Sequence, residues 1–388
     1  MRAAGPARQV EIWGGQRVWL VTRYVEAKTL LADPRLVKDR RRITALFPPG
    51  GAGPMQMTVG GNMLFSDPPD HTRIRKLVAK AFTARSVARM HASIAAVADD
   101  LLDHIESSSS TGTVDMISNY AAPLPIRVIS ELLGVPNDVT DEFRELVMPL
   151  VTVTEPAALQ RAQGELESLL SQVASSKRAE PTDDLLTMLV NVADDRGDQL
   201  SESELLATTF LLVFAGYETT VNLIGNGILA LADYPAQFQL LRDDPTLVAT
   251  AVEEFLRFEA PLNTATLRMT TVDIELDGVT IPADELVMIS LLSAGRDERQ
   301  FSAPDVLDVK RHPNPHLAFG HGVHHCLGAP LARLEGRIAF SKFLERFERV
   351  ELDCDRPRYR NSLLMRGLEA LPVLLHPAPP AEVASKQR

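Results

Sequence analysis

One long apolar segment limits the folds that this chain can adopt. Residues 205–232 carry a single charged side chain, Glu218, in a run that is otherwise uncharged and mostly apolar. A helix of this length and composition either spans a membrane or lies inside a large helical core. Glu218 lies near its middle, where an ionisable group is costly in lipid, and no Lys/Arg cluster flanks the segment. We therefore expect a long buried helix in a soluble protein.

Hydrophobic periodicity and capping signals predict that most of the chain is helical. Ser201 and Glu204 form a capping box at the start of the long helix. Further helices are expected at residues 25–34, 70–82, 86–106, 123–133, 138–152, 157–178, 245–258 and 329–347.

Strand signals are confined to two regions. Residues 17–24 are rich in β-formers, and the chain alternates after Pro261, with an Asp277-Gly278 hairpin signal. Residues 40–65 are rich in Gly and Pro, which predicts a long loop. Because the sequence has no linker or repeat, we expect a mainly α fold with small β-sheets. It would be one domain over residues 1–376, with a disordered tail at 377–388.

Composition excludes several classes of protein. The net charge of −11 disfavours binding to nucleic acid or to anionic membranes, since phosphate contacts need clustered Lys and Arg. The chain has only two cysteines, which disfavours a disulfide framework and fits a reducing cytoplasm. The N-terminal residues show no signal peptide.

Histidines, glycines and a cysteine lie together in "HLAFGHGVHHCLG", residues 316–328. A thiolate at Cys326 would precede a predicted helix, whose dipole and free N–H groups would stabilise it. Cys326 is then either a structural cysteine in a glycine turn, a zinc ligand, or a ligand to a flat group that the glycines allow to approach closely. A zinc site would use His321, His324, His325 and Cys326. However, the adjacent residues His325 and Cys326 cannot easily both point at one tetrahedral ion.

The full loop pattern, F-G-x-G-x-H-x-C-x-G, resembles the haem-ligand loop of the cytochrome P-450 superfamily. Three other segments resemble motifs of that family in the same order, namely "DPPDHTRIR" (67–75), "AGYETT" (215–220) and "EEFLR" (253–257). The resemblance covers nearly the whole chain. It implies the family's fold, with haem between the long central helix and the helix after the cysteine loop. Family members usually carry an extra N-terminal stretch before the Gly5-Pro6 pair, so the start of this chain is short by comparison.

The resemblance implies a haem site with named contacts. Haem b would take the Cys326 thiolate as its axial ligand, with O2 as co-substrate. The implied haem-binding residues are His71, Arg75, Arg268 and His324 at the propionates, and Phe319, Gly320, Gly328, Ala215 and Gly216 elsewhere. Thr219 would donate a hydrogen bond to oxygen, and Glu218 would relay protons. A purely structural alternative remains for both, with Thr219 bonded to a carbonyl of its own helix and Glu218 in an ion pair.

Further residues match the family by position. Glu254, Arg257 and Arg311 would form a buried charge network with a structural role. The substrate pocket is expected to include Leu211, Phe214, Leu262, Thr264 and Leu364, with parts of residues 40–65 and 148–178. Most of these are apolar, which favours a medium-sized, largely apolar substrate.

The implied activity is that of a bacterial monooxygenase in secondary-metabolite biosynthesis, cytoplasmic and monomeric. Electrons would come from NAD(P)H through a ferredoxin reductase and a ferredoxin. Arg73, Lys76 and Lys80 share one helix face, opposite His71 and Arg75, and with Arg337 they are candidates for docking the acidic ferredoxin. A solvated helix face explains the first three equally well. The alternatives are a peroxide-driven or oxidative-coupling enzyme, and a haem-binding sensor or carrier without turnover.

Overall fold

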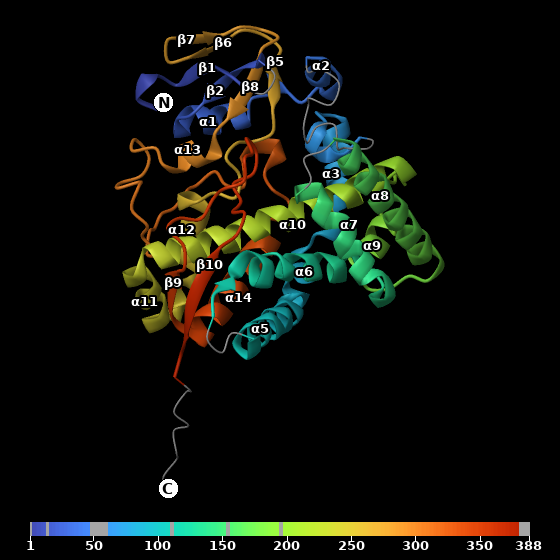
Figure 1. The fold of residues 1–388 in the computed structure, drawn as a ribbon. Coiled ribbons are helices and arrows are strands. Elements are labelled where there is room, and N and C mark those ends of the chain that lie inside the picture. The colour runs from blue at the N-terminus through green and yellow to red at the C-terminus, as the bar shows by residue number, and fades with distance from the viewer. Residues whose placement is uncertain are drawn as a thin grey trace.

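The long apolar segment forms the central helix of the protein. The computed structural model describes residues 2–12, 15–46, 61–108, 112–152, 156–193 and 197–379. Helix α10 (Glu202–Asp233) crosses the helical body in Figure 1, and Ser201 and Glu204 cap its start as predicted. Among the described helices it alone has the length and hydropathy of a membrane span. However, 78% of its most apolar window is buried inside the protein, which confirms the predicted core helix.

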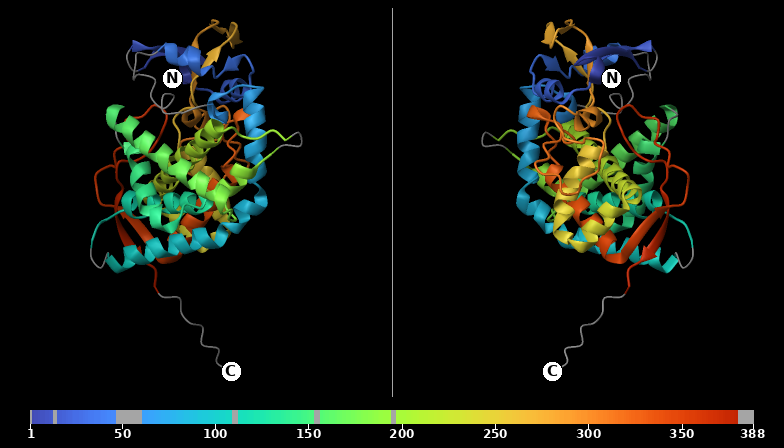
Figure 2. Two further views of the ribbon diagram at one scale, coloured as in Figure 1. Left: turned by 90° about the vertical axis from the view of Figure 1, so that its right-hand side faces the viewer. Right: turned by 90° about the vertical axis from the view of Figure 1, so that its left-hand side faces the viewer.

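Other helices surround α10 and make the body mainly α-helical. They are α3 (Asp70–Ala81), α4 (Ala84–Arg89), α5 (His91–Ser108), α6 (Pro123–Leu133), α7 (Thr140–Thr152), α8 (Pro156–Ala179), α9 (Leu185–Asn191), α11 (Pro235–Asp243), α12 (Val248–Phe258) and α14 (Ala329–Arg346). Figure 2 shows α3, α4 and α5 along one edge of this body.

A small mixed sheet lies at one end of the helical body (Figure 1). Its strands, in spatial order, are β1 (Ala7–Glu11), β2 (Arg17–Val21), β8 (Leu286–Ile289), β5 (Arg268–Thr270) and β3 (Leu36–Val37). Strands β2 and β8 are parallel, and the other pairs are antiparallel. The short helices α1 (Tyr24–Leu31) and α13 (Leu291–Gly295) lie beside the sheet.

Two smaller sheets complete the β-structure of the described residues. One is the hairpin of β6 (Ile274–Leu276) and β7 (Val279–Ile281). Its turn residues Asp277 and Gly278 have φ of 44° and 81°, the left-handed backbone that the sequence predicted. The other has the order β4 (Val114–Asp115), β10 (Pro372–Pro377) and β9 (Phe347–Leu352).

Close helix packing fixes the position of the cysteine loop. A Cβ at Gly227 of α10 would lie 2.3 Å from Cζ of Phe340 on α14 and 3.2 Å from Cδ2 of Phe255 on α12. A side chain at this position would therefore force the three helices apart. Because α14 begins just after Cys326, the contact between α10 and α14 holds the cysteine loop at a set distance from the central helix.

Several predicted boundaries were wrong. The helix expected at 86–106 is two helices, α4 and α5, which meet at Met90 without any Gly or Pro to signal the break. The strand expected at 17–24 ends at Val21, because Tyr24 already begins α1. The predicted loop at 40–65 contains α2 (Arg40–Ala45), capped by Asp39, and a 3₁₀ turn at Met63–Phe65. Residues 47–60 and most of the predicted tail, 380–388, lie outside the described residues.

Candidate active site

The cysteine loop presents an accessible sulfur inside dense protein. The surface of Cys326 is exposed, yet burial by surrounding groups raises the pKa of its thiol. Backbone N–H groups of Gly328 and Ala329 oppose this rise in pKa by donating to the sulfur, as the sequence predicted. The N–H of Cys326 itself donates to the carbonyl of Phe319 at 2.9 Å. These backbone bonds fix the loop around an exposed Cys326 side chain.

The middle of α10 also has an accessible stripe. Ala215 is exposed, and Gly216 and Thr219 are half-buried, although most of the helix is inaccessible. An exposed alanine in the centre of a core helix indicates that this face lines an internal space rather than packing against protein. Small residues leave room there for a ligand.

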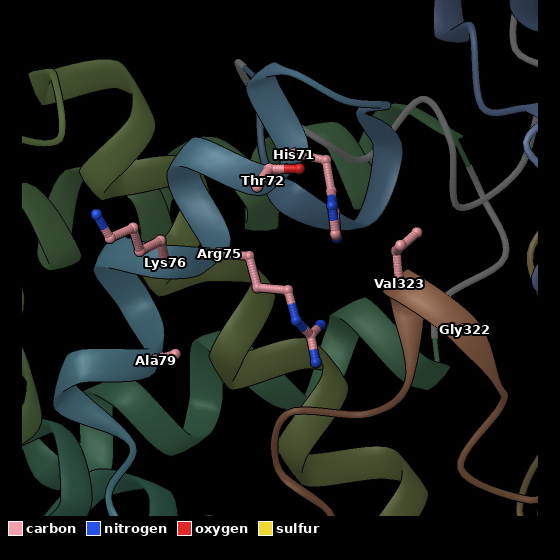
Figure 3. Close-up of a pocket in the computed structure, with 7 residues that line it drawn as sticks. All are labelled: His71, Thr72, Arg75, Lys76, Ala79, Gly322 and Val323. Atoms are coloured by element: carbon pink, nitrogen blue, oxygen red, sulfur yellow. The ribbon is translucent and has the colours of Figure 1, made fainter.

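Cationic and imidazole groups gather beside the cysteine loop. His71 and His324 have ring centroids 4.3 Å apart, and His71 and Arg268 are almost fully buried. Neither ring nitrogen of His71 has a hydrogen-bond partner among the described groups, and neither does Nε of Arg268. Figure 3 shows His71 and Arg75 pointing from α3 toward Gly322. They line a hollow of about 400 Å³ there.

This cluster also contains a lysine that sequence reasoning missed. Lys38 is only 2% exposed, and its Nζ donates to the carbonyl of Leu64 at 2.8 Å. Burial, followed by repulsion from Arg268, lowers the pKa of Lys38 well below its ordinary value. Lys38 in turn lowers the pKa of His71, after burial and Arg75. So many like charges with unpartnered donors require an anionic ligand, and a group with two carboxylates fits.

Glu218 and Thr219 of α10 have the partners that the purely structural alternative predicts. The Thr219 hydroxyl donates to the carbonyl of Ala215 at 2.6 Å. Oε1 of Glu218 pairs with Nη1 of Arg360 at 3.1 Å, while Oε2 is buried and has no partner in the described part of the chain. Burial raises the pKa of Glu218, and Arg360 partly opposes this rise. The Thr219 oxygen can still accept a hydrogen bond and Glu218 Oε2 is uncommitted, so these bonds leave the proton-relay role available.

The predicted charge network is present and fully buried at its centre. Arg257 Nε and Nη2 each lie 2.7 Å from a carboxylate oxygen of Glu254, and both residues have 0% exposure. Arg311 Nε adds a contact of 3.1 Å to Glu254 Oε2. Asn314 Nδ2 donates to the same oxygen at 3.0 Å. Since Asn314 lies just before the cysteine loop, the network anchors the loop to α12.

Comparisons with known proteins decide the family. The family model described as "Cytochrome P450" matches residues 126–370. The chain belongs to the cytochrome P450 family. A relative named vitamin D(3) 25-hydroxylase, from Pseudonocardia autotrophica, is 44% identical over 379 residues, covering 97% of this chain and 92% of the relative. The polyketide biosynthesis cytochrome P450 PksS of Bacillus subtilis is 38% identical over 369 residues, covering 92% and 89%.

Solved structures agree with this assignment. The structure titled as the tirandamycin C-bound P450 monooxygenase TamI matches with a TM-score of 0.88 and 43% identity, covering 97% of this chain and 95% of that one. The predicted fold class is thus confirmed, and the protein is a P450 monooxygenase. Family membership implies haem with a cysteine thiolate ligand, and O2 as co-substrate. Among the described residues no group of His, Cys, Asp and Glu is arranged to hold a metal ion by itself, so the zinc interpretation finds no ligand set there.

The P450 structure corrects the predicted docking face on α3. Arg73 pairs with Asp198 at 3.4 Å and also with Glu204, so its charge is committed to the start of α10. Lys80 Nζ donates to the carbonyl of Ala193 at 2.8 Å. Lys76 is exposed, and Figure 3 shows it pointing away from the hollow. The helical wheel identified the outward face correctly but could not show which neighbours cover it.

Arg337 of α14 is exposed, and its Nε donates to the carbonyl of Arg333 at 3.2 Å. Lys76, Lys80 and Arg337 are thus the predicted docking cations that the structure leaves exposed, whereas Arg73 is only partly exposed.

The substrate-pocket candidates lie on α10 and on two further segments of the P450. Leu211 and Phe214 lie on α10, and Leu262 and Thr264 follow α12. Two backbone segments, 261–265 and 362–366, are joined by hydrogen bonds, with the Asn263 side chain donating to the carbonyls of residues 362 and 365. The Thr264 hydroxyl donates to the carbonyl of residue 363 at 3.1 Å, so it is not free to donate to a substrate. Leu364 is half-buried in the second segment. The side chains of residues 148–156 lie outside the description.

Proposed function

We propose that the Cys326 thiolate binds the haem iron, and that the enzyme hydroxylates or epoxidises a medium-sized, largely apolar substrate. The observation that carries this assignment is the accessible Cys326 sulfur, which accepts backbone N–H bonds from Gly328 and Ala329. The second cysteine, Cys354, lies between β9 and β10, away from any family motif. Haem supplies the activation of O2, and thiolate ligation favours O–O cleavage.

The residues present fit a haem with two propionates. Lys38, His71, Arg75, Arg268 and His324 supply more positive charge and free donors than the neighbouring protein neutralises. Arg75 and Arg333 additionally favour the thiolate form of the cysteine through their charge. We further propose that Phe319, Gly320 and Gly328 of the loop, and Ala215 and Gly216 of α10, contact the haem, as the resemblance implies.

Protons would reach the reaction space through α10. Glu218 is 4% exposed, whereas the side chain of its partner Arg360 is 24% exposed. The pair therefore connects a buried carboxylate to the solvent side. Thr219, the next residue, has its hydroxyl on the accessible stripe. In this proposal Glu218 holds a proton beside Thr219. The Thr219 hydroxyl relays it by turning its own O–H from the Ala215 carbonyl to a new acceptor while its oxygen accepts a hydrogen bond.

The substrate class follows from the lining and from the names of relatives. Leu211, Phe214, Leu262 and Leu364 are apolar, and the Thr264 hydroxyl is already bonded. One relative is named a vitamin D(3) hydroxylase, another a polyketide biosynthesis enzyme, and the TamI structure holds tirandamycin C. We therefore place the substrate among apolar secondary metabolites. A panel of terpenoids, macrolides and polyketides, screened for spin-state shifts of the haem, tests this; binding confined to small polar compounds would contradict it.

Electrons are proposed to come from NAD(P)H through a ferredoxin reductase and an acidic ferredoxin. Lys76, Lys80 and Arg337 remain as docking cations, whereas Arg73 is paired with Glu204. Lys76→Glu should lower ferredoxin-driven turnover and reduce its dependence on salt. Arg8→Glu, on the exposed edge strand β1, is the matched control and should change neither. Equal turnover in all three proteins would contradict this docking site.

The same assay separates the alternatives. Monooxygenation consumes NAD(P)H and adds one oxygen atom to the product mass. Efficient turnover with peroxide alone would favour a peroxide-driven enzyme, and a product that has lost hydrogen without gaining oxygen would favour oxidative coupling. Bound haem with no turnover under any of these conditions would favour a sensor or carrier.

A further inference from the structure

Two adjacent glutamates on α12 hold different parts of the cysteine loop. Glu254 belongs to the buried network with Arg257 and Arg311. Glu253 instead pairs with Arg333 of α14, with Nε to Oε1 at 2.7 Å and Nη2 to Oε2 at 2.8 Å. Its Oε2 also lies 3.0 Å from Nε2 of His316. Glu253 thus links His316, the first residue of the loop, to α14, the helix that follows the loop.

The hydrogen-bond partners determine the state of His316. The N–H of Ala318 donates to Nδ1 of His316 at 3.2 Å, so Nδ1 is an acceptor. Nε2 therefore carries the proton and donates to Glu253. The His316 side chain is almost fully buried, and its ring packs near Phe319 at 5.9 Å between centroids. Through its two ring nitrogens, His316 fixes the start of the loop to Glu253.

Arg333 completes the path to the cysteine. Its guanidinium carbon lies 4.5 Å from the centroid of the Phe319 ring, a cation–π distance. The carbonyl of Phe319 accepts the N–H of Cys326. Arg333 itself lies in the second turn of α14, which begins three residues after Cys326. Arg333 is thus both a packing contact and a positive charge beside the cysteine loop.

Glu253 offsets this charge. Arg333 and His316 oppose the effect of burial and hold the pKa of Glu253 at about 2, so Glu253 is ionised at neutral pH. Next to the iron–thiolate unit, the Glu253–Arg333 pair has no net charge. Removing Glu253 would leave the positive charge of Arg333 close to the sulfur, and removing Arg333 would leave the negative charge of Glu253 there.

We propose that Glu253 is a positioning residue that sets the haem reduction potential by neutralising Arg333 behind the Cys326 thiolate. The proposal rests on the assignment of Cys326 as the haem ligand. Reduction adds an electron to the iron–thiolate unit, so a nearby positive charge favours the ferrous form and a negative charge favours the ferric form. The sign of the change in potential therefore depends on which partner is removed.

The test is a charge cycle read as reduction potential in the substrate-free holoenzyme. Glu253→Gln should raise the potential, changing the ferrous-to-ferric ratio at fixed electrode potential by about tenfold, which is about 59 mV for one electron. Arg333→Gln should lower the potential, and the Glu253→Gln/Arg333→Gln double variant should return close to wild type. Arg337→Gln, an exposed arginine one turn further along α14, is the control for loss of a charge and should leave the potential unchanged.

If Glu253 and Arg333 only hold the cysteine loop in place, without an electrostatic effect on the iron, the variants should give a different pattern of potentials. Both single variants would then weaken thiolate ligation in the same direction, the double variant would be worst, and the proposal would be overturned. The charge-keeping variants Glu253→Asp and Arg333→Lys should retain the wild-type potential, and a large shift in them would also overturn it. If a single variant loses haem, the double variant tests the proposal, and its reduction potential should equal that of wild type. Absence of thiolate-ligated haem in the wild type would instead refute the assignment of Cys326.

Discussion

Arg257→Met removes the centre of the network that anchors the cysteine loop. Arg257 has 0% exposure and makes charge-assisted bonds to both oxygens of Glu254. It also donates to the carbonyls of residues 295, 304 and 306 at 2.7, 2.8 and 3.3 Å. The methionine keeps much of the side-chain volume but leaves Glu254 with Arg311, Asn314 and one backbone N–H. Breaking a buried pair in this way costs about 3–5 kcal/mol of unfolding free energy.

Urea unfolding, followed by far-UV circular dichroism and by haem absorbance at equal haem saturation, measures this cost. We expect the haem signal to be lost at lower urea than the helical signal, because the network holds the loop rather than the whole body. Arg358→Met removes an arginine that is 86% exposed and paired with Glu369 at 3.3 Å. This control should be indistinguishable from wild type. A loss below about 1 kcal/mol in Arg257→Met would refute the reasoning on orphaned buried charge.

Four further changes test other parts of the site. Thr219→Ala should divert the electrons of NAD(P)H into peroxide and lower the product yield. Unchanged coupling of NAD(P)H use to product would show that protons arrive by another route. The control is Thr29→Ala, which removes the same kind of i−4 hydrogen bond on exposed α1. Arg360→Gln removes a group that lowers the pKa of Glu218, so the limb of the pH–turnover profile that reports Glu218 should move to higher pH, and a shift to lower pH would contradict the pairing. Lys38→Met should speed transfer of haem to an apoprotein acceptor, whereas Lys28→Met on exposed α1 should not; equal rates in both would remove Lys38 from the site. Burial raises the pKa of Glu335 to about 8, so the folded protein keeps this carboxyl protonated where the unfolded chain ionises it. The contribution of Glu335 to the free energy of unfolding is therefore fully present at acid pH and is lost as pH rises through about 8. Glu335→Gln should flatten this pH dependence of unfolding, and parallel curves for the variant and wild type would refute it.

Residues with a local sequence signature were predicted well. The capping box at Ser201, the Asp277-Gly278 turn and the apolar run of α10 each depend on neighbours in the chain. Glu254 and Arg257 have the i,i+3 spacing of a helical pair, whereas Arg311 could be added only through the family resemblance because it lies too far along the chain. Arg268 was likewise found through the resemblance, and the structure buries it to 4% exposure.

Residues defined by tertiary contacts were missed. Lys38 looks like a surface lysine beside Asp39 and Arg40, and only the folded chain buries it against Arg268. His316 was given no role, yet it donates to Glu253, which no sequence pattern connects with it. Arg73 was expected to face solvent, but the segment before α10 places Asp198 and Glu204 against it. A helical wheel shows which residues share a face but not which element covers that face.

Short elements were missed for a related reason. Helices α9 and α11 were not predicted, although Asp184 caps the first and Pro235 begins the second. Seven to nine residues give too few turns for a clear apolar period, so tertiary packing rather than local pattern stabilises them.

The CO-bound spectrum of the reduced protein tests the central assignment most directly. Wild type should show the red-shifted Soret band of thiolate-ligated haem. Cys354→Ser should keep this band, and Cys326→His should bind haem without it. A colourless wild-type protein, or a red-shifted band that persists in Cys326→His, would contradict the assignment of Cys326 as the ligand.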